Sequence, residues 1–164
     1  FIENQNGNYN PHDEVSNLES ARILIDHVTE GIEIAKKHKL PEQIIDFIRT
    51  HHGTKKVDYF YRMEQNENPD EEIDISDFQY HGPKPFSKET AIVMMSDSVE
   101  AASRSLKEPT EKNINTLVDK IIDQQMQENQ FFNADITFSD ISVAKKIIKR
   151  KLHNVYHVRI EYPD

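Results

Sequence analysis

Apolar residues recur every three or four positions in several stretches of the chain, and short polar or proline-containing segments separate these stretches. The first stretch covers about residues 17–39 and ends at Leu40-Pro41. Pro41 suits the first turn of a second helix, which is expected to reach about His52. The inward-facing residues expected are Ala21, Leu24, Ile25, Val28, Ile32 and Ala35 in the first helix, and Ile44, Ile45 and Ile48 in the second.

Four more helices are expected after Gly53, which ends the second. Thr54, Ser87 and Ser139 are placed to cap helix starts, because a hydroxyl oxygen can accept a hydrogen bond from a free N–H of the first turn. Glu89 follows closely behind Ser87, as in a capping box. The expected helices cover about residues 54–65, 87–106, 110–128 and 139–155.

The remaining segments are expected to be irregular. Residues 1–16 are polar and rich in Asn, which indicates a loop. Residues 64–86 form a second loop, strongly acidic in its first part and fixed by glycine and two prolines in its second. The tail 155–163 alternates enough to form a short strand. The fold class is therefore all-α, an array of about six helices.

Composition narrows the function classes. The chain has 164 residues, which suits one domain, and 36% of them are hydrophobic. The net charge of −9 argues against indiscriminate nucleic-acid binding, but a phosphate substrate stays compatible because bound metal ions can reverse the local field. There is no cysteine, which excludes disulfides and thiolate metal sites, and no apolar run is near 18 residues.

Asp97 is the first candidate for chemistry, because it is the only charged residue in residues 90–99. An ionised carboxylate among apolar neighbours is costly unless it is paired or bound to metal. Asp97 is therefore expected to bind a metal ion, to pair with an Arg or Lys of another helix, or to lie in a polar patch at the helix surface.

The adjacent pair His51-His52 is the second candidate. Neutral imidazole is a common metal ligand. Consecutive residues of a regular helix point about 100° apart, so the rings converge only if the helix bends as it ends at Gly53. The alternative is a solvated pair that the helix dipole favours at a C-terminus.

His27 is the third candidate, since it lies on the inner face of the first helix. Gly31, one turn later, is expected to leave room beside the ring. A lone histidine here can equally be a core residue. The combination of His27, His51 and His52, however, can supply three ligands to one metal ion.

Two cations are candidates for binding substrate phosphate. Arg104 lies two turns after Asp97 on the same helix face, but it can instead pair with Glu100. Lys84 lies in the rigid Gly-Pro-Lys-Pro segment. The run of lysines and Arg150 within residues 145–151 is interpreted as a solvated helix face, and the other histidines are given no role.

The order of these motifs resembles the HD-domain metal-dependent phosphohydrolases. The strings DFIRTHHGT, YHGPKPFSKETAIVMMSDSVEAASRSL and FIENQ are similar to the cytoplasmic HD domain of bacterial seven-transmembrane-receptor HD proteins, a branch that includes cyclic-di-AMP phosphodiesterases. The similarity extends over essentially the whole chain. It implies an HD-domain fold and hydrolysis of a cyclic dinucleotide by a water that two metal ions activate.

The resemblance also implies a dinuclear iron or manganese centre whose ligands include His27, His51, His52 and Asp97. The family's His-Asp dyad and an earlier histidine are expected before FIENQ, and His12-Asp13 does not match that dyad. The chain begins at Phe1, so it is expected to be the C-terminal part of a single HD domain of a longer protein, truncated at its N-terminus. Such a fragment is expected to hold little or no metal and to be inactive alone.

Two further expectations concern the membrane and self-association. The resemblance implies a bacterial inner-membrane protein with this domain in the cytoplasm and its transmembrane segments upstream. Exposed helix faces favour a homo-oligomer. Two alternatives to the phosphodiesterase stay open: a non-catalytic helical signalling module with structural histidines, and an HD phosphohydrolase that acts on another nucleotide.

Overall fold

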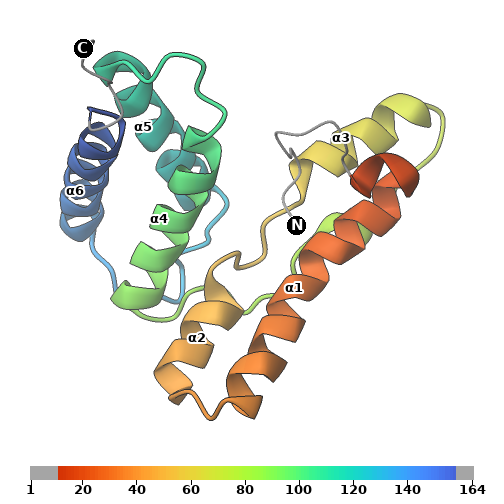
Figure 1. Cartoon of the computed structure of the whole chain (residues 1–164), viewed down its shortest axis with the longest axis horizontal. Helices are drawn as coiled ribbons and strands as arrows, with labels where there is room; N and C mark the ends of the chain where they lie inside the picture. Colours follow the sequence, from red (N-terminus) through yellow and green to blue (C-terminus); the bar gives the residue numbers. More distant parts are fainter. Residues whose placement is uncertain (1–10, 158–164) are drawn as a thin grey trace, which may run out of the picture. The chain divides into compact units, whose positions relative to one another are not determined.

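The structure, a computed structural model, describes residues 11–157. Within this range the chain forms six α-helices and two short 3-10 helices, with one isolated antiparallel β-bridge between Lys56 and Gln79 (Figure 1). The expected all-α class is confirmed. The chain divides into two compact units, Phe1–Pro83 and Lys84–Asp164. None of the helices in the described range is long and apolar enough to span a bilayer.

The first unit contains α1 (Asn17–Lys37), α2 (Glu42–Thr50) and α3 (Asp58–Glu67), with the 3-10 helices η1 (Pro11–Glu14) and η2 (Ile75–Phe78). In Figure 1, α1 and α2 form an antiparallel hairpin, and α1 also packs against α3 and η2. The Ser16 side chain caps α1 by accepting a hydrogen bond from the Glu19 N–H at 3.1 Å. The buried core of this unit consists of Ala21, Leu24, Ile25, Val57, Phe60 and Phe78.

Gly31 serves the packing of the α1–α2 hairpin and not the His27 ring. A Cβ atom at Gly31 would lie 3.0 Å from Cγ2 of Ile48 on α2. The two helices therefore approach closely because residue 31 has no side chain.

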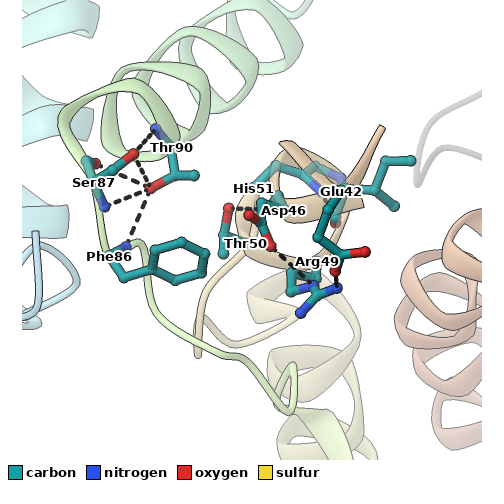
Figure 2. Close-up of polar contacts among 9 residues, drawn as sticks. Glu42, Asp46, Arg49, Thr50, His51, Phe86, Ser87 and Thr90 are labelled. Atoms are coloured by element: carbon teal, nitrogen blue, oxygen red, sulfur yellow. Dashed lines mark hydrogen bonds and ion pairs between the residues drawn. The ribbon is translucent and has the colours of Figure 1, made fainter. Parts of the chain in front are cut away.

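The second unit contains α4 (Lys88–Ser103), α5 (Glu111–Gln127) and α6 (Phe138–His157). Helix α5 packs against both α4 and α6. Ser87 and Thr90 cap α4 reciprocally: the Thr90 N–H donates to the Ser87 hydroxyl at 3.2 Å, and the Ser87 N–H donates to the Thr90 hydroxyl at 3.0 Å (Figure 2). The central buried residues are Ala91, Met94, Met95, Val99, Ile114, Val118 and Ile122.

All six expected helices are present, but two expected caps are wrong. Helix α3 starts at Asp58, not at Thr54, because the intervening residues pair with residues 78–80. Helix α6 starts at Phe138, and its cap is Thr137, not Ser139. The Thr137 hydroxyl accepts a hydrogen bond from the Asp140 N–H at 3.1 Å, and the Asp140 carboxylate accepts one from the Thr137 N–H at 2.9 Å.

Other expectations differ in detail. Glu89 does not close the capping box of α4, since Thr90 does. Ile44, expected inside, is 41% exposed. The acidic loop is shorter than expected, since α3 continues to Glu67 and η2 forms at residues 75–78. The expected tail strand is wrong at residues 155–157, which belong to α6, and the rest of it lies outside the described residues.

Candidate metal centre

Three imidazole rings meet in the first unit. His27 lies on α1, His51 follows the last residue of α2, and His52 comes next. One nitrogen from each ring lies within 4.8 Å of the others. The ring centroids of His51 and His52 are 4.0 Å apart, and His27 lies 5.2 Å from the first and 4.9 Å from the second. The three histidines singled out in the sequence are thus brought together.

The convergence of His51 and His52 depends on the end of α2. The helix stops at Thr50, whose hydroxyl donates a hydrogen bond to the Asp46 carbonyl at 2.6 Å (Figure 2). Gly53 then adopts φ of 55°, and its N–H donates to the Thr50 carbonyl at 3.0 Å. The two histidines therefore lie in a turn, where consecutive side chains are not splayed as they are inside a helix.

Backbone carbonyls fix the tautomers of two of the rings. Nδ1 of His27 contacts the Leu24 carbonyl, and Nδ1 of His51 lies 2.7 Å from the Ile48 carbonyl. Since a carbonyl oxygen only accepts, each Nδ1 carries the hydrogen, and in the neutral ring Nε2 keeps its lone pair.

The two Nε2 atoms of His27 and His51 lie 3.1 Å apart. Two lone pairs facing each other at this distance repel unless a proton or a cation lies between them. Imidazole nitrogens bound at about 2.1 Å to one metal ion are separated by about 3.0 Å in octahedral geometry and about 3.4 Å in tetrahedral geometry. The donor set, its tautomers and its spacing therefore fit a divalent transition metal.

His52 is held in its neutral, metal-binding form. Burial, followed by the nearby His51, His27 and Lys55, lowers its pKa to about 2. The Tyr80 ring stacks on it, with centroids 4.2 Å apart and planes 18° from parallel. A cavity of about 70 Å³ adjoins His52 and Tyr80 but is not lined by His27 or His51, so it is separate from the point where the three rings converge.

Asp97, the fourth predicted ligand, lies on α4 in the second unit. It is half-buried, beside the buried Met94 and Ser98. In the part of the chain that the structure describes, Asp97 has neither a hydrogen bond nor an ion pair. The ion pair considered as an alternative from the sequence is therefore not observed among these residues.

The two candidate phosphate-binding cations have other contacts. The Arg104 guanidinium lies 2.8 Å from the Glu100 carboxylate, the alternative pairing that the sequence allowed. Nζ of Lys84 donates to the Asn129 carbonyl at 3.1 Å. Both interactions are at the surface, so both side chains can exchange partners.

Two residues near the histidines were not singled out from the sequence. Tyr80 stacks on His52, and Arg49 forms ion pairs with Glu42 and Asp46 along α2 (Figure 2). The spacing of Arg49 with its partners was a local signal that helical periodicity could have shown. Tyr80 is 28 residues from His52, and nothing local in the sequence indicates their contact.

The family profile described as HD domain matches residues 7–102, which contain all four predicted metal ligands. The chain belongs to the HD domain family. HD domains depend on bound metal, and the histidine cluster of the first unit is a donor set of the required kind.

Relatives within the family are similar over the whole chain. The cyclic-di-AMP phosphodiesterase PgpH of Listeria monocytogenes serotype 1/2a (strain 10403S) is 42% identical over 164 residues, and PgpH of Bacillus subtilis (strain 168) is 40% identical over the same length. In both comparisons 100% of this chain is covered, but only 23% of the relative. The chain thus spans about a quarter of the length of these proteins.

Solved structures agree with this assignment. The crystal structure of the L. monocytogenes PgpH HD domain matches with a TM-score of 0.87 and 39% identity, over 96% of this chain and 73% of that one. The same HD domain in complex with cyclic-di-AMP matches with a TM-score of 0.88 and 40% identity, over 95% of this chain and 72% of that one.

Proposed function

We propose that this chain is part of the catalytic domain of a metal-dependent phosphodiesterase that hydrolyses cyclic-di-AMP. The observation that carries the proposal is the convergence of His27, His51 and His52, with their ligand nitrogens within 4.8 Å of one another. The substrate rests on the similarity to an HD domain solved with cyclic-di-AMP bound.

The four predicted ligands have distinct supports. His27 and His51 present Nε2 because backbone carbonyls hold Nδ1–H, and His52 is neutral because burial lowers its pKa. Asp97 is proposed as a further ligand because a half-buried carboxylate without a hydrogen bond or ion pair among the described residues can bind a cation. The proposed cofactor is a dinuclear iron or manganese centre.

When bound, such a centre lowers the pKa of a water and neutralises charge on the phosphate. The protein's own part is to hold the imidazoles in one tautomer and one place. Arg104 and Lys84 are proposed to orient the phosphate, and each would exchange a surface contact, with Glu100 or with the Asn129 carbonyl, for a phosphate oxygen.

The test is hydrolysis of cyclic-di-AMP by the full-length gene product, with the linear product measured by chromatography. Chelation is expected to abolish turnover, and Mn²⁺ or Fe²⁺ to restore it. His52→Ala is expected to lose activity, and His38→Ala, an exposed histidine outside the cluster, is the matched control. If the protein hydrolyses another nucleotide in a metal-dependent way but not cyclic-di-AMP, the proposed substrate is wrong and the proposed enzyme class stands. A full-length gene product that neither binds metal nor hydrolyses a nucleotide would favour the alternative, a non-catalytic helical signalling module.

Location and assembly are also proposed. Similarity to PgpH supports a cytoplasmic HD domain of a bacterial inner-membrane protein. Exposed apolar side chains such as Phe132 and Phe138, which are 82% and 80% exposed, support self-association. Membrane fractionation of the full-length gene product and light scattering of this chain test the two points.

A further inference from the structure

The three clustered histidines are held in place in two different ways. The rings of His27 and His51 are each oriented by a backbone carbonyl at Nδ1. Among the described residues His52 makes no such hydrogen bond. Its ring packs against the rings of His27, His51 and Tyr80, and the Tyr80 ring is the one closest to parallel.

Tyr80 is itself fixed by the backbone next to the histidine pair. Its N–H donates to the Lys55 carbonyl at 2.9 Å, and the Val57 N–H donates to the Phe78 carbonyl at 2.8 Å. The Gln79 side chain adds a hydrogen bond to the Thr54 carbonyl at 2.7 Å. The short segment 78–80 is thus attached to residues 54–57, which directly follow the turn that carries His52.

The geometry of the ring pair limits the motion of His52. The planes differ by 18°, so rotation of the imidazole about its Cβ–Cγ bond would drive it into the phenol ring. Tyr80 also meets His27 edge-on, with centroids 6.1 Å apart and planes at 81°. One side chain therefore contacts two of the three rings.

We propose that Tyr80 is a positioning residue for the metal centre: its stacked ring orients His52, as backbone carbonyls orient His27 and His51. The inference rests on the proposed function, because it takes the three histidines as metal ligands. Residues that orient a ligand without touching the metal typically change metal affinity 10- to 100-fold when they are removed, which is about the effect expected here.

The first measurement uses the metal-free chain, so that it does not depend on metal binding. The ring protons of His52 lie over the Tyr80 ring and are expected to show an upfield ring-current shift in a histidine-selective NMR spectrum. Tyr80→Leu is expected to abolish this shift, and Tyr80→Phe to keep it. An unchanged His52 shift in Tyr80→Leu would overturn the inference.

The second measurement is the Co²⁺ affinity of the full-length gene product and its variants, read from visible absorbance. Tyr80→Leu is expected to bind about tenfold more weakly, and Tyr80→Phe within about twofold of the parent. The matched control is Tyr61→Leu, because Tyr61 packs on the same core but its ring contacts Phe78 and not a histidine. It is expected to lose packing stability without losing Co²⁺ affinity.

The outcomes separate this inference from the proposed function. If Tyr80→Leu and Tyr61→Leu weaken Co²⁺ binding equally, Tyr80 acts through the core, and the inference is wrong. Tenfold weaker binding by Tyr80→Phe would overturn it as well, since that variant keeps the ring. A full-length gene product that binds no Co²⁺ contradicts the metal centre, and the His52 shift then still decides whether Tyr80 orients that ring.

Discussion

His52 stays neutral in the folded protein because burial, together with His51 and His27, lowers its pKa to about 2. In the unfolded chain the same ring titrates near pH 6.5. Above pH 6.5 His52 is neutral in both the folded and the unfolded protein, so its ionisation does not change the free energy of unfolding. As the pH falls below 6.5 the unfolded state takes up a proton that the folded state cannot, so stability is lost progressively toward pH 2.

The metal-free protein is therefore expected to lose up to about 1.4 kcal/mol of unfolding free energy per pH unit below pH 6.5 through this residue. Urea denaturation at several pH values between 7 and 4, with chelator present, measures it. His52→Gln should flatten the dependence relative to the parent. Parallel curves for the two proteins would show that His52 is protonated in the fold.

Gly53 matters because its φ is 55°, a conformation that residues with a Cβ rarely adopt. Gly53→Ala is expected to lower the unfolding free energy by about 1–2 kcal/mol. Gly53→Asn should lose less, because Asn tolerates the left-handed region better. Urea denaturation of both variants measures this, and a larger loss for Gly53→Asn would mean that side-chain volume, not backbone conformation, is limiting.

The sequence predicted that three histidines come together but not all of what holds them. His27, His51 and His52 were predicted from residue type and position, and the convergence of the pair followed from the glycine after it. The stacking of Tyr80 could not be predicted, since it depends on backbone pairing between residues 54–57 and 78–80, which no periodicity reveals. The role of Gly31 was predicted wrongly, because its neighbour Ile48 is on another helix.

At the scale of the elements, helix extents followed from apolar periodicity, and helix starts did not. Helices α1 and α5 begin within a residue of their expected starts because Ser16 and Thr110 are well placed as caps. Where two hydroxyl residues lie close together, as at Thr137 and Ser139, the sequence does not show which hydroxyl accepts the hydrogen bond from a first-turn N–H. The cap is decided by the backbone conformation that the preceding loop imposes.

The two hydroxyls can be separated by experiment. Thr137→Ala removes the acceptor of the Asp140 N–H and is expected to cost about 1 kcal/mol of unfolding free energy. Ser139→Ala, inside the first turn of α6 and exposed, is the matched control and should change stability by less than about 0.5 kcal/mol. Thermal denaturation of both variants measures the difference. A larger loss of unfolding free energy for Ser139→Ala would show that Ser139, and not Thr137, caps α6.

At the scale of the whole molecule, three of the proposed ligands, His27, His51 and His52, lie in the first compact unit, and Asp97 lies in the second. The all-α class and the HD family were predictable from the sequence because long strings around the histidine pair and Asp97 are specific. The division into two units was not predicted, since the chain length suits a single domain and apolar stripes recur along the whole chain.

Asp97 is the proposed ligand that lies in the second unit, and its variants test that role. Asp97→Ala in the full-length gene product is expected to lower kcat/KM for cyclic-di-AMP by at least about 100-fold, because a direct ligand should matter no less than a residue that only orients one. Glu100→Ala is the matched control, since it removes an exposed carboxylate one turn later on α4 and frees Arg104.

The control also reports on Arg104. If that guanidinium grips the phosphate, its release from Glu100 should leave KM unchanged or lower it, whereas loss of Asp97 should act on kcat and on metal content. Metal analysis of the purified variants distinguishes these effects. Full activity and full metal content in Asp97→Ala would remove Asp97 from the centre and leave the three histidines as the only ligands this chain contributes.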